Sequence, residues 1–163
     1  MKVLFSPQSG ISKELSRLIK AAKGEISVAA YAFSSKYLGN AMAAAQKRGV
    51  KVRIILDRDN ADQAYSIDEW LIQQGIDTRF IQVKSGCMHH KFMLIGNKML
   101  MTGSYNFTNE SEFRNYEAAL FTNSKPLIKT FTAEFERLWL LSSAPSLPVP
   151  PSPPLGGKGD YGG

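Results

Sequence analysis

Short apolar runs of strand length alternate with segments of helical periodicity through the first half of the chain, and this alternation limits the possible folds more than any other feature. Within each helical segment, apolar residues recur every three or four positions, and a glycine follows the segment. This pattern indicates right-handed βαβ units around a sheet. The expected strands cover residues 3–5, 25–33, 50–56 and 78–83, and the expected helices have apolar faces at Ile11, Leu15, Leu18 and Ile19, at Leu38, Ala41, Met42 and Ala45, and at Ile67, Trp70 and Leu71.

In the second half of the chain, expected strands follow one another more closely. Residues 88–95 and 99–101 are separated by Gly96-Asn97-Lys98, and a glycine-containing turn of this length is typical of a hairpin. Residues 117–121 form a further expected strand, and the apolar face within residues 127–139 predicts a closing helix. We therefore expect an α/β fold in which helices flank one mixed, largely parallel β-sheet.

The length of 163 residues matches a single domain, because about 150 residues is the usual size of a unit with one core. A hydrophobic fraction of 44% excludes a wholly disordered chain. The composition changes near residue 144, since six of the eight prolines and five of the thirteen glycines lie between Pro145 and Gly163. Such a segment cannot bury enough apolar surface to offset its ordering entropy. We expect a folded domain over residues 1–143 and a disordered Pro/Gly-rich tail over residues 144–163.

The amino-terminal residues show no pattern of a targeting or membrane segment. Three consecutive apolar residues follow Lys2, far fewer than a signal-peptide core needs, and no later run could span a bilayer. We expect a cytoplasmic protein without stable membrane insertion, or an exported one if a signal peptide has been removed. The single cysteine, Cys87, excludes an intrachain disulfide and fits either compartment.

The two histidines are adjacent, and His89 is separated from Lys91 by one residue at the start of an expected strand. Side chains alternate along a strand, so His89 and Lys91 are expected on one face and His90 on the other. An imidazole and an ammonium placed in this way can meet one phosphate group, the imidazole at phosphorus and the ammonium at a non-bridging oxygen. A solvated pair at the edge of a sheet is the alternative explanation of this spacing.

A second polar segment, Gly103-Ser104-Tyr105-Asn106, directly follows the second strand of the hairpin. Ser104 and Asn106 are two residues apart, so an extended backbone would turn both the same way, and both could donate hydrogen bonds to phosphate oxygens. Gly, Ser and Asn are also common turn formers, which is the alternative explanation.

These segments resemble the phospholipase D superfamily, in particular its short bacterial endonucleases that carry one copy of the catalytic motif. The similarity extends from residue 3 to about residue 141, and the motifs occur in the expected order. It rests on His89-x-Lys91, on Gly103-Ser104-x-Asn106, on Glu117 within residues 115–118, and on the segments 30–34 and 47–57.

The resemblance implies the phospholipase D fold over residues 1–143 and a metal-independent phosphodiesterase that works through a phosphohistidine. His89, Lys91, Asn106 and Glu117 are the catalytic residues it implies, with Lys91, Ser104 and Asn106 also binding the substrate and Glu117 orienting His89. Since the chain has one suitable histidine and double displacement uses two, the resemblance implies a homodimer with a His89 from each subunit in a shared cleft. Gly96 stands where the family has aspartate, so an acceptor is missing there.

No cofactor and no metal are expected. Cys87, His89 and His90 lie together in the sequence without a well-spaced fourth ligand, and no acidic cluster resembles a two-metal nuclease centre. Lys91 with Ser104 and Asn106 would take the place of a cation.

The net charge of +6 favours a polyanionic partner. The motif segments are flanked by Arg58, Lys84, Lys98 and Arg114. We expect Arg58, Lys84 and Arg114 to bind the backbone of DNA or RNA, largely without regard to sequence. Two alternatives remain. Met and Phe side chains near the motifs could provide an approach surface for a phospholipid, and Gly96 motivates a weakened module that binds nucleic acid without turnover.

Overall fold

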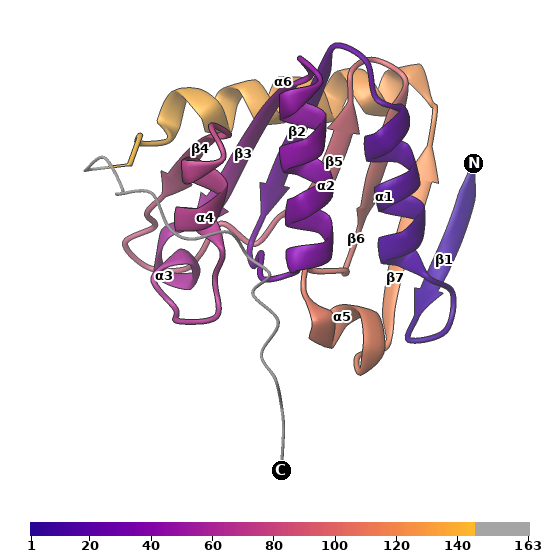
Figure 1. Ribbon diagram of the computed structural model, residues 1–163, viewed down its shortest axis with the longest axis horizontal. Helices are drawn as coiled ribbons and strands as arrows, with labels where there is room; N and C mark the ends of the chain where they lie inside the picture. The colour runs from indigo at the N-terminus through magenta and orange to yellow at the C-terminus, as the bar shows by residue number, and fades with distance from the viewer. Residues whose placement is uncertain (146–163) are drawn as a thin grey trace.

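The computed structural model describes residues 1–145, and these form a seven-stranded sheet between two layers of helices (Figure 1). Apart from Ala144 and Pro145, the expected tail lies outside the described residues. Along the sheet the strand order is β1-β7-β6-β5-β2-β3-β4. The strands are β1 (Lys2–Ser6), β2 (Glu25–Ala30), β3 (Lys51–Asp57), β4 (Asp77–Ile81), β5 (Lys91–Ile95), β6 (Met99–Gly103) and β7 (Glu117–Thr122), and the helices are α1 (Ile11–Ala21), α2 (Lys36–Lys47), α3 (Arg58–Ala61), α4 (Asp68–Gln73), α5 (Asn109–Phe113) and α6 (Lys125–Leu141).

The expected α/β architecture with a mixed sheet is confirmed, but the described sheet is not largely parallel. Only β2, β3 and β4 pair in parallel. The pairings β2–β5, β5–β6, β6–β7 and β1–β7 are antiparallel. Parallel neighbours need a crossover of a dozen or more residues, usually a helix. The turn between β5 and β6 is far too short for that, so these two strands pair antiparallel as a hairpin.

Each face of the sheet has its own apolar core. Helices α1, α2 and α4 pack on one face, which lies toward the viewer in Figure 1, and α6 covers the other. The alternation of side chains along β5 shows the division, because Met93 belongs to the core under α1 and α2 whereas Phe92 and Leu94 belong to the core under α6. The face of α6 that contacts the sheet carries Ile128, Phe135, Leu138 and Trp139.

The strand directions bring several polar segments to one edge of the sheet. The registers place Ala30 at the end of β2 opposite Lys91 at the start of β5, and Ser6 at the end of β1 opposite Glu117 at the start of β7. Gly103 at the end of β6 pairs with Ala119 at the same edge. We call this edge, where β2, β3 and β6 end and β5 and β7 begin, the polar edge; it is the lower edge in Figure 1. The turn between β5 and β6 lies at the opposite edge.

Two short helices, α3 and α5, were not expected from the sequence. They have four and five residues, so neither completes enough turns to show an apolar period. Each has a side-chain cap: Asp57 accepts from the backbone N–H of Asn60, and Thr108 accepts from that of Ser111. Both helices lie at the polar edge.

Within residues 1–145, no helix combines the length and the apolar composition that a bilayer crossing requires.

Candidate active site

His89 and Lys91 lie together at the polar edge, and both contact the ring of Tyr31. The His89 ring is exposed, and its centroid lies 4.6 Å from that of Tyr31. The Lys91 ammonium lies 5.0 Å from the centroid of the Tyr31 ring and donates a hydrogen bond of 2.7 Å to the carbonyl oxygen of His89. The expectation that His89 and Lys91 share a side of the chain is therefore consistent with the structure, although β5 begins at Lys91 and His89 precedes it.

Lys91 is a buried cation, with 8% of its surface exposed. Burial lowers the pKa of its ammonium below the usual 10.5, while Cys87 and Glu117 act in the opposite direction. A desolvated ammonium interacts strongly with an anion that approaches it, because less water screens the charge. Lys91 is thus suited to stabilise negative charge on a phosphate oxygen next to His89.

His90 lies on the opposite side of the chain from His89, as expected. Its ring is 5.8 Å from that of Phe92, and its Nε2 lies 3.2 Å from the carboxylate of Glu134 on α6. His90 is therefore tied to the helix layer, although it lines a surface cleft together with His89.

Gly103 brings β6 and β7 close together before Ser104. A Cβ at Gly103 would lie 2.0 Å from the carbonyl oxygen of Ala118, and its φ is +157°. This close approach lets the N–H of Ser104 donate to the oxygen of Ala118 at 3.0 Å, and the N–H of Ala118 donate to the hydroxyl of Ser104 at 3.1 Å. The glycine of the motif is therefore required by packing between backbones.

The carboxylate of Glu117 forms hydrogen bonds with residues other than His89, its expected partner. Its carboxylate accepts hydrogen bonds from the hydroxyl of Ser104 and, at 3.1 Å, from the amide of Asn115. No hydrogen bond joins Glu117 to His89 in the described chain, so the expected orienting contact is not made within one subunit. The hydroxyl hydrogen of Ser104 is directed to Glu117, so Ser104 is held as a partner of that carboxylate instead of being free to donate to a phosphate.

Asn106 lies at the polar edge with an unsatisfied amide. Its Oδ1 is buried and has no hydrogen-bond partner in the described part of the chain. Buried polar atoms are nearly always paired, so an orphan of this kind points to a ligand. An amide oxygen accepts hydrogen bonds, so Asn106 is placed to receive a donor group of a ligand. The expected donation from its amide to a phosphate oxygen stays a prediction.

The expected phosphate-binding cations are dispersed. Arg58 pairs with Asp62 at 2.9 Å and lies over the ring of Phe80 at 4.6 Å, so its guanidinium is engaged within its own neighbourhood. Lys84 and Arg114 are exposed at the polar edge, in the loop that leads to His89 and directly after α5. Lys98 lies in the β5–β6 turn at the opposite edge and cannot flank the site.

Gly96 also lies in that turn, at the far end of β5 from Lys91. It has φ +47°, and no atom lies within 4 Å of the position a Cβ would take. The aspartate expected from the family would therefore not have reached His89, and glycine at this position removes no group from the polar edge.

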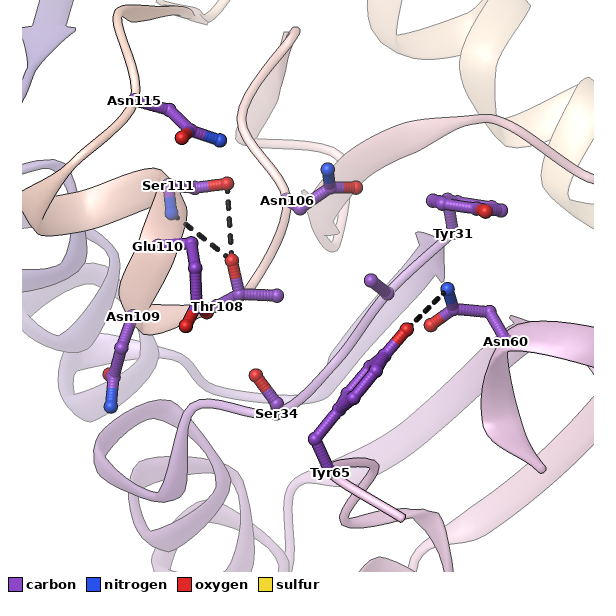
Figure 2. Close-up of a pocket in the computed structure, with 11 residues that line it drawn as sticks. Tyr31, Ser34, Asn60, Tyr65, Asn106, Thr108, Asn109, Glu110, Ser111 and Asn115 are labelled. Atoms are coloured by element: carbon purple, nitrogen blue, oxygen red, sulfur yellow. Dashed lines mark hydrogen bonds between the residues drawn. The ribbon is translucent and has the colours of Figure 1, made fainter. Parts of the chain in front are cut away.

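Two clefts lie near His89, and their walls differ in chemistry: His89 lines one, and Tyr31, whose ring contacts His89, lines the other. The polar cleft, of about 590 Å³, is lined by Tyr31 and Asn106 and by further amide and hydroxyl side chains (Figure 2). The apolar cleft, of about 470 Å³, has an apolar wall together with four other side chains. The apolar residues are Ile81, Val83, Met88, Leu138 and Leu141, and the others are Cys87, His89, His90 and Arg137. A phosphodiester held at His89 and Lys91 could extend one arm into each cleft.

Several residues of this region were not singled out as site residues from the sequence. Tyr31 follows directly after β2, and that place at the end of a buried strand was the signal that could have identified it. Asn115 lies two residues before Glu117. Asn60 and Tyr65 come from α3 and from the loop after it, which had no recognisable pattern. Among residues 1–145, no three His, Cys, Asp or Glu side chains are grouped so that they could hold a metal ion.

A family profile described as "Cardiolipin synthase, PLD-like domain" matches residues 15–139. The chain belongs to the phospholipase D superfamily. The solved structure of Nuc from Salmonella typhimurium, titled a phospholipase D family member, supports this assignment with a TM-score of 0.82 and 29% identity over 88% of this chain and 95% of that one. NucT from Helicobacter pylori shares the fold, with a TM-score of 0.81 at 21% identity over 88% of this chain and 97% of that one.

Curated relatives within the phospholipase D superfamily carry lipid-related names. The human mitochondrial cardiolipin hydrolase is 36% identical over 132 residues, which is 81% of this chain and 52% of that protein. A phospholipase D from Rickettsia prowazekii is 35% identical over 131 residues, 78% of this chain and 62% of that protein. The chain thus covers between about half and two thirds of the length of these relatives.

Proposed function

We propose that the chain is a metal-independent phosphodiesterase that cleaves nucleic acids through a phosphohistidine, as a homodimer. The observation that carries the proposal is the grouping of an exposed imidazole, His89, with the buried ammonium of Lys91 at the polar edge. A nucleophile next to a fixed positive charge is the arrangement that displacement at a phosphate needs.

Bond making and breaking in this proposal use two copies of His89. A ring nitrogen of one His89 attacks phosphorus, the bond from phosphorus to the leaving oxygen breaks, and the His89 of the second subunit gives that oxygen its proton. The second imidazole then takes a proton from water, whose oxygen displaces the first imidazole from phosphorus. Lys91 stabilises the negative charge on the non-bridging oxygens in both steps.

Exposed aromatic side chains beside the site support the dimer. Phe113 and Tyr116 are 69% and 92% exposed, and both lie in the segment that leads to Glu117. Phe5, on the edge strand β1, is 60% exposed and pairs with Ala118. Aromatic residues of this size are enriched in protein interfaces. A second subunit that covers them would approach along the polar edge, where its His89 is needed.

Single-stranded DNA, plasmid DNA and RNA incubated with the protein in EDTA test the reaction. We expect cleavage to survive chelation and to be abolished in His89→Ala. His90→Ala is the matched control for the nucleophile, since the adjacent imidazole pairs with Glu134 on α6. His90 also lines the apolar cleft, so this variant can change KM, but its kcat should stay close to that of the unaltered protein. Cleavage that requires added metal, or that persists in His89→Ala, would contradict the proposal.

The dimer is tested by sedimentation of the protein at the concentration used for catalysis. We expect a two-subunit species, and we expect Tyr116→Asp to weaken it and to lower activity together, because both depend on the same contact. A fully active monomer would overturn the two-histidine scheme.

A phospholipid hydrolase is the second candidate, and two observations favour it. The curated relatives named above carry lipid-related names, and the apolar cleft beside His89 could receive an acyl chain. Vesicles that contain cardiolipin or phosphatidylglycerol distinguish the candidates. If these lipids are hydrolysed and DNA and RNA stay intact under the same conditions, the lipid function replaces the nuclease.

A further inference from the structure

The polar cleft continues directly from the candidate active site. Tyr31 contacts His89 and Lys91 with its ring and also lines the cleft. Asn106 lines the cleft too, and its amide oxygen has no hydrogen-bond partner among the described residues. A volume of about 590 Å³ lies within the range of small-molecule sites. A substrate whose phosphate lies at His89 would therefore place the group next to that phosphate in the polar cleft.

The chemistry of the wall restricts what this group can be. The residues that line the cleft carry amides, hydroxyls and phenols, and Glu110 is the one charged side chain among them. None of the described residues that line it is Lys or Arg. A second phosphate would meet no cation there, and an acyl chain would leave the polar wall unpaired, which costs free energy. The wall fits an uncharged group that offers many hydrogen bonds.

The wall of the polar cleft contains an exposed aromatic ring, that of Tyr65, whose hydroxyl is fixed by a hydrogen bond. Tyr65 is 55% exposed, and its hydroxyl oxygen accepts a hydrogen bond of 3.0 Å from the side-chain amide of Asn60. Asn60 is itself buried and fixed through its backbone N–H to Asp57. Figure 2 shows Tyr65 and Asn60 on one side of the cleft, with Thr108 and the α5 residues on the other. The ring of Tyr65 is thus oriented by its neighbours while much of it stays open to a ligand.

We propose that the polar cleft binds the nucleoside attached to the scissile phosphate, with its base stacked on Tyr65. The proposal rests on the nuclease function above and names the part of the substrate that this cleft recognises. A planar base offers both the stacking face that an exposed phenol ring accepts and the polar edge that amides and hydroxyls pair with. Because a base in this cleft cannot remain in a duplex stack, single-stranded nucleic acid should be cleaved faster than duplex.

Small chromogenic diesters test the cleft without the rest of a polymer. Thymidine p-nitrophenyl phosphate, as its 5′ and 3′ isomers, carries a nucleoside, whereas methyl p-nitrophenyl phosphate has the same leaving group without one. For the preferred isomer, we expect Tyr65→Ala to lower kcat/KM by about tenfold, the loss of one stacking contact. We expect it to leave the methyl diester within about twofold of the unaltered protein.

Two further variants make the test specific. Tyr65→Phe keeps the ring but loses the hydrogen bond from Asn60, so its preference for the nucleoside diester should lie between that of Tyr65→Ala and that of the unaltered protein. Tyr37→Ala is the matched control, because Tyr37 is 51% exposed but lies on α2 outside the polar cleft, and it should cleave both diesters normally. Thermal unfolding of each variant checks that the fold is retained.

The outcomes separate this inference from the function on which it rests. Equal cleavage of the nucleoside diester by Tyr65→Ala and the unaltered protein, or an equal loss on both diesters, would overturn the nucleoside site while the nuclease stands. If the unaltered protein hydrolyses the methyl diester and lipid vesicles but leaves single-stranded DNA intact, the nuclease function fails and the nucleoside site fails with it.

Discussion

Lys91 holds the backbone of the residue that we propose as the nucleophile, since its ammonium donates a 2.7 Å hydrogen bond to the carbonyl oxygen of His89. The same ammonium lies 5.0 Å from the centre of the Tyr31 ring, and the His89 ring also contacts the Tyr31 ring. Lys91 thus has two roles at once, a positive charge for the substrate and a support for the loop that carries His89.

Lys91→Met should remove both roles while keeping a side chain of similar length. We expect kcat to fall by about 10²- to 10³-fold, the usual effect of losing one group that stabilises transition-state charge. Lys91→Arg should restore only part of the rate, because a planar guanidinium does not replace a point charge at a buried position. Steady-state kinetics with a small diester measure the loss. Unchanged kcat in Lys91→Met would exclude the lysine from the reaction.

The alkaline side of the pH dependence should also report on Lys91. Burial lowers the pKa of this ammonium, so it loses its proton below 10.5 in the folded protein and the rate should begin to fall there. The lysine of the unfolded chain keeps its proton up to a higher pH than that of the folded protein. The contribution of Lys91 to the free energy of unfolding therefore rises with pH between the lowered pKa and 10.5. In Lys91→Arg the alkaline fall in rate should move to higher pH. A fall at the same pH in both proteins would assign it to another group.

Gly103→Ala should destabilise the fold through a clash of backbones. The added Cβ would meet the carbonyl oxygen of Ala118 at 2.0 Å, and we expect the free energy of unfolding to drop by about 3 kcal/mol. Gly24→Ala is the control, since Gly24 has φ +95° but no atom within 4 Å, and it should cost only about 1 kcal/mol of backbone strain. Urea unfolding of the two variants compares them. Equal losses would mean that packing between β6 and β7 does not require the glycine.

Gly96→Asp restores the residue that the family has at this position, and it should change little. The site of substitution is exposed, lies at the opposite edge from His89 and has φ +47°, which aspartate tolerates better than most residues. We expect a change in unfolding free energy of about 0.5 kcal/mol or less, and kcat close to that of the unaltered protein. A large gain in activity would show that the aspartate acts on the site from a distance.

Much of the fold could be predicted from the sequence because its long elements have strong periods. The apolar faces of α1, α2 and α6 and the buried runs of β2 and β3 were all recognised. The proportion of parallel and antiparallel pairs in the sheet was not predicted correctly. The spacing of apolar residues identifies a strand but does not show which strand it pairs with. The antiparallel pairing of β5 with β2 joins segments about 60 positions apart, and no local pattern encodes it.

The sequence predicted the part of the candidate site whose residues lie close together along the chain. His89 and Lys91 lie two positions apart, so local geometry was sufficient to group them. The hydrogen-bond partner of Glu117 could not be predicted in this way, because it depends on the close approach of β6 and β7 at Gly103. That approach places the Ser104 hydroxyl where it donates to the Glu117 carboxylate. Tyr65 could not be predicted, because its position depends on the irregular loop after α3 and on a hydrogen bond from Asn60 to its hydroxyl.

The turn at residues 96–98 lies at the opposite end of the sheet from the polar edge, and this separation has a practical use. Gly96 has open space around it, and α6 approaches the turn through a hydrogen bond from the Lys125 ammonium to the oxygen of Asn97. A cysteine introduced at Lys98, in a background with Cys87 replaced, would let the protein be tethered to a sensor chip by this turn. The immobilised molecules would then present their reactive side uniformly to the flowing solution.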